Sequence, residues 1–143
     1  MKTSFNELEN KIGYKFNQLS LLEESLSHSS LRQNKKQYKF DYEKLEFFGD
    51  SILSFVITEK LYNEYTSLNE GELAKFRNYL ISKDIIVQAA NSINLSQYII
   101  MTDGEEKVGG RINVNNIENA MEALLAGIYV DSNYEIHHAR SLI

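Results

Sequence analysis

The hydrophobic positions of the chain recur mostly at intervals of three and four residues, which is the spacing of amphipathic helices. Polar residues that commonly cap helices stand before four of these runs: Ser4 with Glu7, Asn17, Asp41, and Asn69 with Glu72. Together, the periodicity and the caps predict helices over residues 4–13, 17–26, 41–65, 69–82, 84–94, 116–131 and 133–143.

Two segments between these helices lack the periodicity. Residues 27–40 are polar and lysine-rich, and residues 102–115 contain Gly104, Gly109 and Gly110, so both are predicted to be loops, the second a flexible one. Residues 98–101 form the only β-like run, which is too short to build a sheet. No proline interrupts the helices anywhere in the 143 residues. We therefore expect one all-α domain over residues 1–143.

Charge and cysteine content narrow the chemistry. The 20 acidic residues exceed the 15 Lys and Arg residues. The resulting net charge of −5 argues against a protein that binds nucleic acid through its overall charge. A metal-dependent nuclease remains possible, because bound cations reverse the sign of a carboxylate-rich site. The absence of cysteine excludes disulfides and thiolate metal sites. The longest apolar stretch, residues 52–57, is too short to cross a bilayer, so no membrane association is expected and a cytoplasmic protein fits.

Three carboxylates project from one side of the predicted helix 41–65. At about 100° per residue, Glu43, Glu46 and Asp50 fall within an arc of about 60°. Such a stripe is often only a solvated helix face, and its like charges cost a few tenths of a kcal/mol each. The opposite side carries apolar residues that are expected to pack: Leu45, Phe48, Ile52, Phe55 and Val56.

Two neighbours of this stripe favour a functional role. Gly49 lies inside the helix, where glycine costs about 1 kcal/mol relative to alanine, so we expect a close approach of backbone or ligand there. Phe47 lies on the acidic side, and an exposed phenylalanine there predicts a partner surface.

The predicted helix 116–131 offers a second set of oxygen ligands. Asn119 and Glu122 are three residues apart and share a face. Carboxylate and amide oxygens from two helices, with no cysteine, suit Mg²⁺ or Mn²⁺ rather than zinc. Metal-assisted hydrolysis is therefore compatible with the sequence. A carboxylate-bridged metal protein of the ferritin type is disfavoured, because such a site uses two Glu-x-x-His pairs and the chain has only one, Glu135 with His138.

The same segments carry a close resemblance to a known family. Residues 43–51 read EKLEFFGDS and resemble the ribonuclease III signature ERLEFLGDS, with two conservative changes. Weaker matches extend over nearly the whole chain: LSHSS at residues 26–30, NEGEL at 69–73, GEE at 104–106, GGR at 109–111 and EALLAGIYVD at 122–131.

This resemblance implies a homodimeric, all-helical endonuclease domain that cuts double-stranded RNA to leave 5′-phosphates and short 3′ overhangs, as in the processing of ribosomal and messenger RNA. Two Mg²⁺ ions, replaceable by Mn²⁺, would activate water and stabilise the departing 3′ oxygen, and no organic cofactor is implied. By position, the metal ligands are Glu46, Asp50, Asn119 and Glu122, with Asp50 and Glu122 holding the catalytic cations. Glu43 and Glu70 match acids of the cleavage valley near the subunit junction, and Phe47 matches the residue that plugs into the partner subunit.

The chain departs from the family pattern at Asn119, where relatives usually have Asp. An amide oxygen can still ligate a cation but brings no charge, so a catalytically weakened or silent RNA-binding member is the alternative hypothesis. Bacterial members also usually carry a C-terminal domain that binds double-stranded RNA. The sequence contains none, and we expect it to be a truncated form of a longer protein.

Basic residues and histidines complete the set of candidates. Lys107 and Arg111 are candidate RNA contacts, because their loop leads into the helix that bears Glu122. His28 is expected to have a structural, hydrogen-bonding role, and His137 and His138 are expected to lack acidic partners at metal-ligand spacing. The remaining candidates for phosphate contact form the basic group of residues 27–40: Arg32, Lys35, Lys36 and Lys39.

Overall fold

The computed structural model describes residues 2–34 and 41–143, and in these ranges it is built from helices. The one β feature described is an isolated bridge between Ser27 and Ile100, so the expected all-α class is confirmed. The α-helices are α1 (Lys2–Ile12), α2 (Leu19–Leu26), α3 (Glu43–Glu64), α4 (Glu70–Leu80), α5 (Lys83–Ser92), α6 (Asp103–Lys107), α7 (Val114–Asp131) and α8 (Ile136–Leu142). Short 3₁₀ helices lie between them: η1 (Ser29–Asn34), η2 (Leu95–Tyr98) and η3 (Gly110–Ile112).

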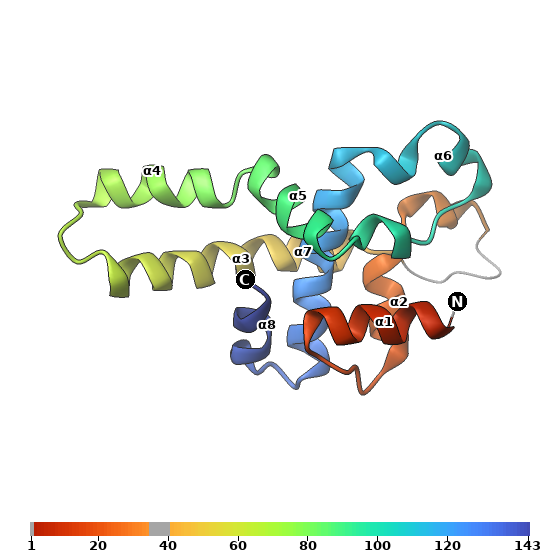
Figure 1. Ribbon diagram of the computed structural model, residues 1–143, viewed down its shortest axis with the longest axis horizontal. Helices are drawn as coiled ribbons and strands as arrows, with labels where there is room; N and C mark the ends of the chain where they lie inside the picture. Colours follow the sequence, from red (N-terminus) through yellow and green to blue (C-terminus); the bar gives the residue numbers. More distant parts are fainter. Residues whose placement is uncertain (1, 35–40) are drawn as a thin grey trace.

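Helix α7 forms the centre of the molecule. It packs against α2, α3, α5 and α8, and Figure 1 shows α1 and α2 on one side of it and the long α3–α4 hairpin extending away on the other. Its core positions are small or branched and fully buried: Ala120, Ala123, Leu124, Ala126 and Ile128. Small side chains let neighbouring helices approach closely, which places the polar residues of α7 near those of α3.

Gly49 lies where α3 crosses α7. A Cβ atom added there would lie 1.7 Å from the carbonyl oxygen of Glu122, a distance that no real contact permits. The close backbone approach expected from an interior glycine is therefore confirmed. The crossing also brings Asp50, the next residue of α3, beside the turn of α7 that carries Glu122.

The polar residues that the sequence places before α3 and α4 accept hydrogen bonds from backbone N–H groups at the starts of these helices. At α4, Glu72 N–H donates to Asn69 Oδ1 (2.9 Å) and Asn69 N–H donates to Glu72 Oε1 (3.3 Å), which completes the capping box. At α3, the Glu43 N–H donates to Asp41 Oδ1 (2.9 Å). Both caps use residues within three positions of the helix start.

The start of α2 is capped from a distance instead. The helix begins at Leu19, one residue later than a cap at Asn17 would give, and Gln18 rather than Asn17 stands at the N-cap. The Asp131 carboxylate, at the end of α7, accepts from the N–H groups of Asn17 (2.7 Å) and Gln18 (2.8 Å) and from the Tyr14 hydroxyl (2.6 Å). A side chain more than a hundred positions away thus satisfies the backbone at this helix entrance.

The other helix starts also differ from expectation. Helix α1 begins at Lys2, so Ser4 lies within it, and α8 begins at Ile136 rather than near residue 133. The glycine-rich segment 102–115 is largely helical, because Thr102 Oγ1 accepts from the Glu105 N–H (3.3 Å) and starts α6, while α7 begins two residues early at Val114. Segment 27–40 holds η1 in its described part.

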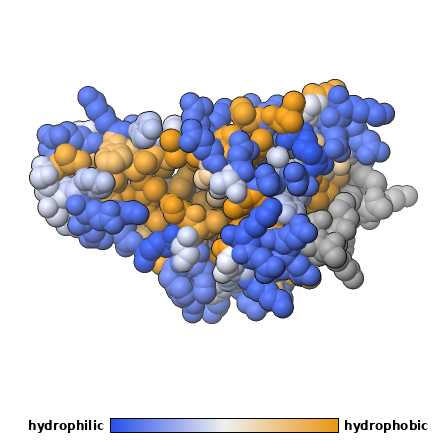
Figure 2. Space-filling model, in the orientation of Figure 1, coloured by the Kyte–Doolittle hydropathy of each residue, from blue (hydrophilic) through white to orange (hydrophobic). Residues whose placement is uncertain are grey.

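The α3–α4 hairpin leaves apolar side chains uncovered. Phe55 was expected to pack but is 57% exposed, and Tyr62 and Tyr79 are also exposed, because little of the chain reaches beyond the middle of α3. Figure 2 shows apolar side chains gathered between the two helices of this hairpin. Within the described ranges, no helix has the length and apolar character needed to span a membrane.

Candidate metal-binding site

Four carboxylates gather where α3 crosses α7. Glu46 and Asp50 come from α3, and Glu118 and Glu122 come from α7. Glu122 is only 5% exposed and forms a hydrogen bond with the Asp50 carboxyl, while Glu46 and Glu118 are close enough to repel it. The structure therefore brings together three of the four metal ligands that the sequence indicates.

Burial and mutual repulsion disturb the protonation of these groups. Burial, followed by the hydrogen bond and the repulsion from Asp50, raises the pKa of Glu122 to about 8. The pKa values of Glu46 and Glu118 are also raised, in both cases first by burial and then by neighbouring carboxylates. Lys83 partly offsets the effect at Glu118. The cluster thus has more negative charge than its surroundings neutralise, which favours binding of a cation.

Glu118 was missed by the sequence reasoning as a member of this site. It stands four residues before Glu122, so both project from the same side of α7. Glu46 and Asp50 have the same four-residue spacing on α3. That repeated spacing was the signal that could have identified Glu118.

Asn119, the remaining residue of the predicted ligand set, interacts with Tyr42. Burial raises the pKa of Tyr42 to about 12, and a hydrogen bond from Asn119 opposes that rise. Of the two polar atoms of the Asn119 amide, the carbonyl oxygen is the one that can ligate a cation.

The residues predicted for the subunit junction do not meet within one chain. Glu43 pairs with Arg32 at the start of α3, and Glu70 begins α4 at the far end of the hairpin (Figure 1). Phe47 is 78% exposed. A groove of about 310 Å³ lies between α3 and α4, and its lining includes Glu70: Thr58, Leu61, Tyr62, Glu70, Leu73, Ala74 and Arg77.

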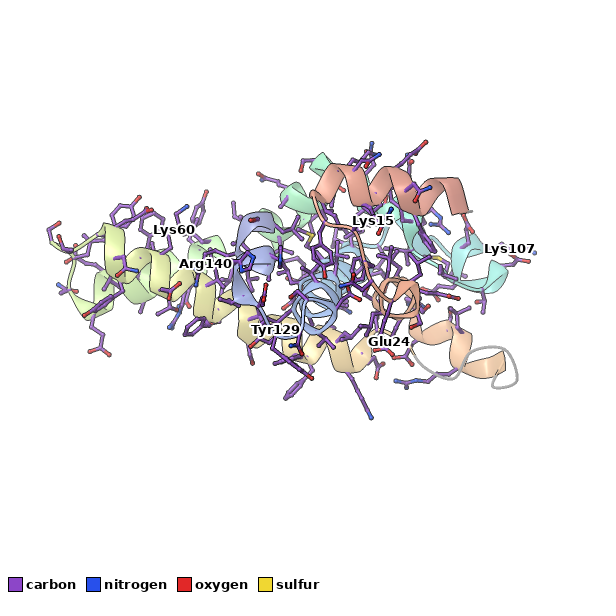
Figure 3. The ribbon with its side chains drawn as sticks, turned by 90° about the horizontal axis from the view of Figure 1, so that it is seen from below. Lys15, Glu24, Lys60, Lys107, Tyr129 and Arg140 are labelled. Atoms are coloured by element: carbon purple, nitrogen blue, oxygen red, sulfur yellow. The ribbon has the colours of Figure 1, made fainter. Side chains whose placement is uncertain are left out.

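The candidate RNA contacts have different environments. Lys107 is exposed and extends outward from the α6 end of the molecule (Figure 3). Arg111 instead donates to the carbonyl oxygens of Ser96 (2.7 Å) and Ile99 (2.9 Å) and to Glu106 (2.8 Å), which gives it a structural role. Lys35, Lys36 and Lys39 lie outside the described residues.

The histidines divide into one buried and two exposed cases. His28 is structural, as expected: its Nδ1 accepts from the Ser30 N–H (2.9 Å) and its Nε2 lies 3.2 Å from Asn116 Oδ1. The expectation that His137 and His138 lack acidic partners was wrong. The Glu135 carboxylate lies 3.7 Å and 3.6 Å from their Nε2 atoms, because the turn before α8 brings the three side chains together.

Sequence comparison relates the chain to known nucleases. The Ribonuclease-III-like family model matches residues 18–143. Ribonuclease 3 of Rickettsia akari (strain Hartford) is 55% identical over 134 residues, which cover 92% of this chain and 59% of that protein. Ribonuclease 3 of Rickettsia prowazekii (strain Madrid E) is 53% identical over 136 residues, which cover 94% of this chain and 60% of that protein. The chain thus spans about three fifths of the length of these relatives.

Structural comparison agrees. The nuclease domain of ribonuclease III from Campylobacter jejuni superposes with a TM-score of 0.86 at 30% identity, over 95% of this chain and 90% of that one. The matched region includes both helices that carry the carboxylate cluster. With a family model over most of its length and relatives more than half identical, the chain belongs to the ribonuclease III family.

Proposed function

We propose that the chain is the nuclease part of an endoribonuclease that hydrolyses phosphodiester bonds of double-stranded RNA. The products would be 5′-phosphate and 3′-hydroxyl ends with short 3′ overhangs. The observation that carries this proposal is the α3–α7 crossing, which brings the buried Glu122 together with the half-buried Glu46 and the exposed Asp50 in one carboxylate cluster. The similarity to a ribonuclease III nuclease domain supports the substrate class.

The donor set fits Mg²⁺, with Mn²⁺ as a substitute. All its donors are oxygens, the ligands that these hard cations prefer, and burial together with the neighbouring carboxylates raises the pKa of Glu122. Glu46, Asp50 and Glu122 would hold the cation, with the carbonyl oxygen of Asn119 as a neutral ligand. When bound, a divalent cation supplies the positive charge that the attack of water on an anionic phosphodiester requires.

The chain's own residues prepare this site in three ways. The helix crossing places the Asp50 and Glu122 carboxyls close enough to interact directly. Gly49 permits the close helix packing on which this proximity depends. Tyr42 lies close enough to Asn119 to interact with it, and the Tyr42 hydroxyl lies 3.5 Å from Asn116 Oδ1. Because these side chains come from helices rather than loops, they are held rigidly before RNA binds.

The competing hypothesis is a catalytically weakened or silent member of the family. It depends on Asn119, whose amide removes one negative charge from the ligand set. The presence of Glu46, Asp50 and Glu122 at the helix crossing favours the hypothesis of an active enzyme. The assay described next separates the two hypotheses, because a silent member would bind RNA without cutting it.

We expect Mg²⁺-dependent cutting of a long RNA duplex and at least about tenfold slower cutting of either strand alone, since the site is proposed to recognise the duplex. The measurement is gel analysis of end-labelled RNA with Mg²⁺, Mn²⁺, Ca²⁺ or EDTA. Ca²⁺ is the matched control, because it binds carboxylates with a looser geometry than Mg²⁺. Equal cutting of duplex and single strands, or full activity in EDTA, would contradict the proposal.

We further propose that two copies form the active dimer, with Phe47 of one copy seated in the α3–α4 groove of the other. One face of α3 carries three exposed aromatic side chains, Phe47, Phe55 and Tyr62, and the groove offers an apolar floor for one of them. Glu70 lines this groove, so seating Phe47 in it would bring Glu70 of one copy near Glu43 of the other. This is the position near the subunit junction that the family resemblance implies for both acids. The Campylobacter jejuni nuclease domain also has a region involved in dimer formation.

Phe47→Ala is expected to weaken dimerisation at least about a hundredfold, because loss of a central aromatic anchor costs 2 kcal/mol or more and a twofold interface loses it twice. Sedimentation equilibrium measures the dissociation constant, and circular dichroism checks that the fold is retained. Leu19→Ala, a truncation of an exposed apolar side chain on α2, is the control and should dimerise normally. A Phe47→Ala dimer as tight as the parent would refute the seated-phenylalanine arrangement.

A further inference from the structure

The turn between α7 and α8 is strained. Asn133 and Tyr134 both have left-handed backbone conformations, with φ of 58° and 65°, and neither is glycine. A left-handed residue of this kind costs on the order of 1 kcal/mol, and tyrosine is an unusual choice. The turn is held by the Tyr134 N–H, which donates to the Tyr129 carbonyl (2.8 Å), and by edge-to-face contact of the two rings. Strain of this type is often associated with ligand-binding geometry.

The strained turn brings three potential metal ligands together. The Glu135 carboxylate lies 3.7 Å from His137 Nε2 and 3.6 Å from His138 Nε2, and the ligand atoms of all three residues lie within 4.8 Å of one another. Throughout residues 2–34 and 41–143, this is the one group of three His, Asp, Glu or Cys side chains with that proximity. The four-carboxylate cluster at the helix crossing is more widely spaced.

The spacing and donor types fit a transition metal. Ligand atoms around a tetrahedral ion with bonds of 2.0–2.1 Å lie about 3.3 Å apart, so the two measured carboxylate-to-nitrogen distances need to shorten by only a few tenths of an ångström. Imidazole nitrogens favour zinc, cobalt or nickel over magnesium. One carboxylate and two neutral imidazoles leave a net charge of −1, which complements a divalent cation. All three side chains are accessible, so the ion can enter from solvent.

We propose that Glu135, His137 and His138 bind one divalent transition-metal ion of the zinc type, which fixes the N-cap and first turn of α8. This site is separate from the carboxylate cluster and does not depend on the proposed RNA cleavage. The consequence is mechanical. Arg140 on α8 pairs with Glu59 on α3 (2.6 Å), and Figure 3 shows Arg140 on the helix that lies beside α3, so a fixed first turn of α8 supports the contact between α8 and α3. His138 also packs on Tyr14, with ring centroids 5.1 Å apart.

Calorimetric titration of the chain with ZnCl₂ at pH 7.5 tests this proposal. We expect a high-affinity event of one ion per chain with a dissociation constant on the order of 10 µM, together with a higher unfolding temperature. A His137→Gln/His138→Gln double variant should bind at least about tenfold more weakly and lose the rise in unfolding temperature. Both histidines are accessible, so the variant should fold, which circular dichroism verifies.

Glu122→Gln is the matched control, because it alters the other cluster that could hold a cation. It should retain the high-affinity zinc event with an unchanged dissociation constant. A second readout is the visible absorption of bound Co²⁺, which should show the intensity of a four-coordinate site and disappear in the double histidine variant. Zinc binding weaker than about 1 mM, or binding that the double variant leaves unchanged, overturns the proposal.

Discussion

Glu122→Gln is expected to reduce RNA cleavage by about a thousandfold or more while stabilising the metal-free protein at alkaline pH. Glutamine has nearly the same shape as glutamate but no charge, so it cannot hold a divalent cation with comparable strength. A thousandfold loss corresponds to about 4 kcal/mol of activation free energy. Single-turnover cleavage of duplex RNA at saturating Mg²⁺ measures this loss.

The gain in stability follows from the raised pKa. Burial and Asp50 raise the pKa of Glu122 to about 8 in the folded chain, against an ordinary value of 4.5. The folded protein therefore retains a proton that the unfolded chain loses, and its stability falls as the pH rises from about 4.5 to about 8. Glutamine removes this penalty. In EDTA, the variant should unfold at a higher temperature than the parent at pH 9, and the difference should shrink toward pH 5.

Glu64→Gln makes the same chemical change at an exposed position near the end of α3 and should alter neither cleavage nor the pH profile of unfolding. A Glu122→Gln variant that cuts RNA at the parental rate would remove Glu122 from the proposed mechanism. One that is less stable than the parent at pH 9 would contradict the electrostatic account of the cluster.

Gly49→Ala is expected to destabilise the fold by about 3 kcal/mol and to lower cleavage at least a hundredfold. The added methyl group would lie 1.7 Å from the Glu122 carbonyl oxygen, so α3 and α7 must move apart. Overpacking of this kind costs about 1–3 kcal/mol, toward the upper end when two backbones are involved. A displacement of about 1 Å between Asp50 and Glu122 is enough for a hundredfold loss.

Urea denaturation and single-turnover cleavage measure the two effects of Gly49→Ala. Gly104→Ala is the control, since a Cβ atom at Gly104, also in a helix, meets nothing within 4 Å. That change should be neutral or slightly stabilising. If Gly49→Ala proved as stable and active as Gly104→Ala, the close crossing would not be what holds the site together.

What the sequence could predict depends on the range of the interactions. The capping box at Asn69 lies within four residues, so the pattern alone located the start of α4. Gly49 was informative because a glycine inside a helix is costly without a packing reason, although its contact, Glu122, could not be named from composition. Glu118 was overlooked, because its side chain belongs to the site only through the position at which α7 crosses α3.

The errors have physical causes too. Segment 102–115 resembled a loop because it is rich in glycine, yet Thr102 supplies a cap and Arg111 anchors the segment to two carbonyl groups. Phe55 was assigned to the core by helical periodicity, which cannot show that α3 extends beyond the body of the molecule. The role of Asp131 at α2 was not predictable, because no local pattern signals a cap supplied by another helix.

The hydrogen bonds of Asp131 also affect the order in which parts of the chain can fold during synthesis. They join residues 113 to 117 positions apart, so the entrance of α2 stays uncapped until Asp131 has left the ribosome. Closing so long a loop is entropically costly and depends on prior docking of α7. The entrance of α2 is therefore completed only after α7 has been made, although α2 precedes α7 by almost ninety positions in the chain.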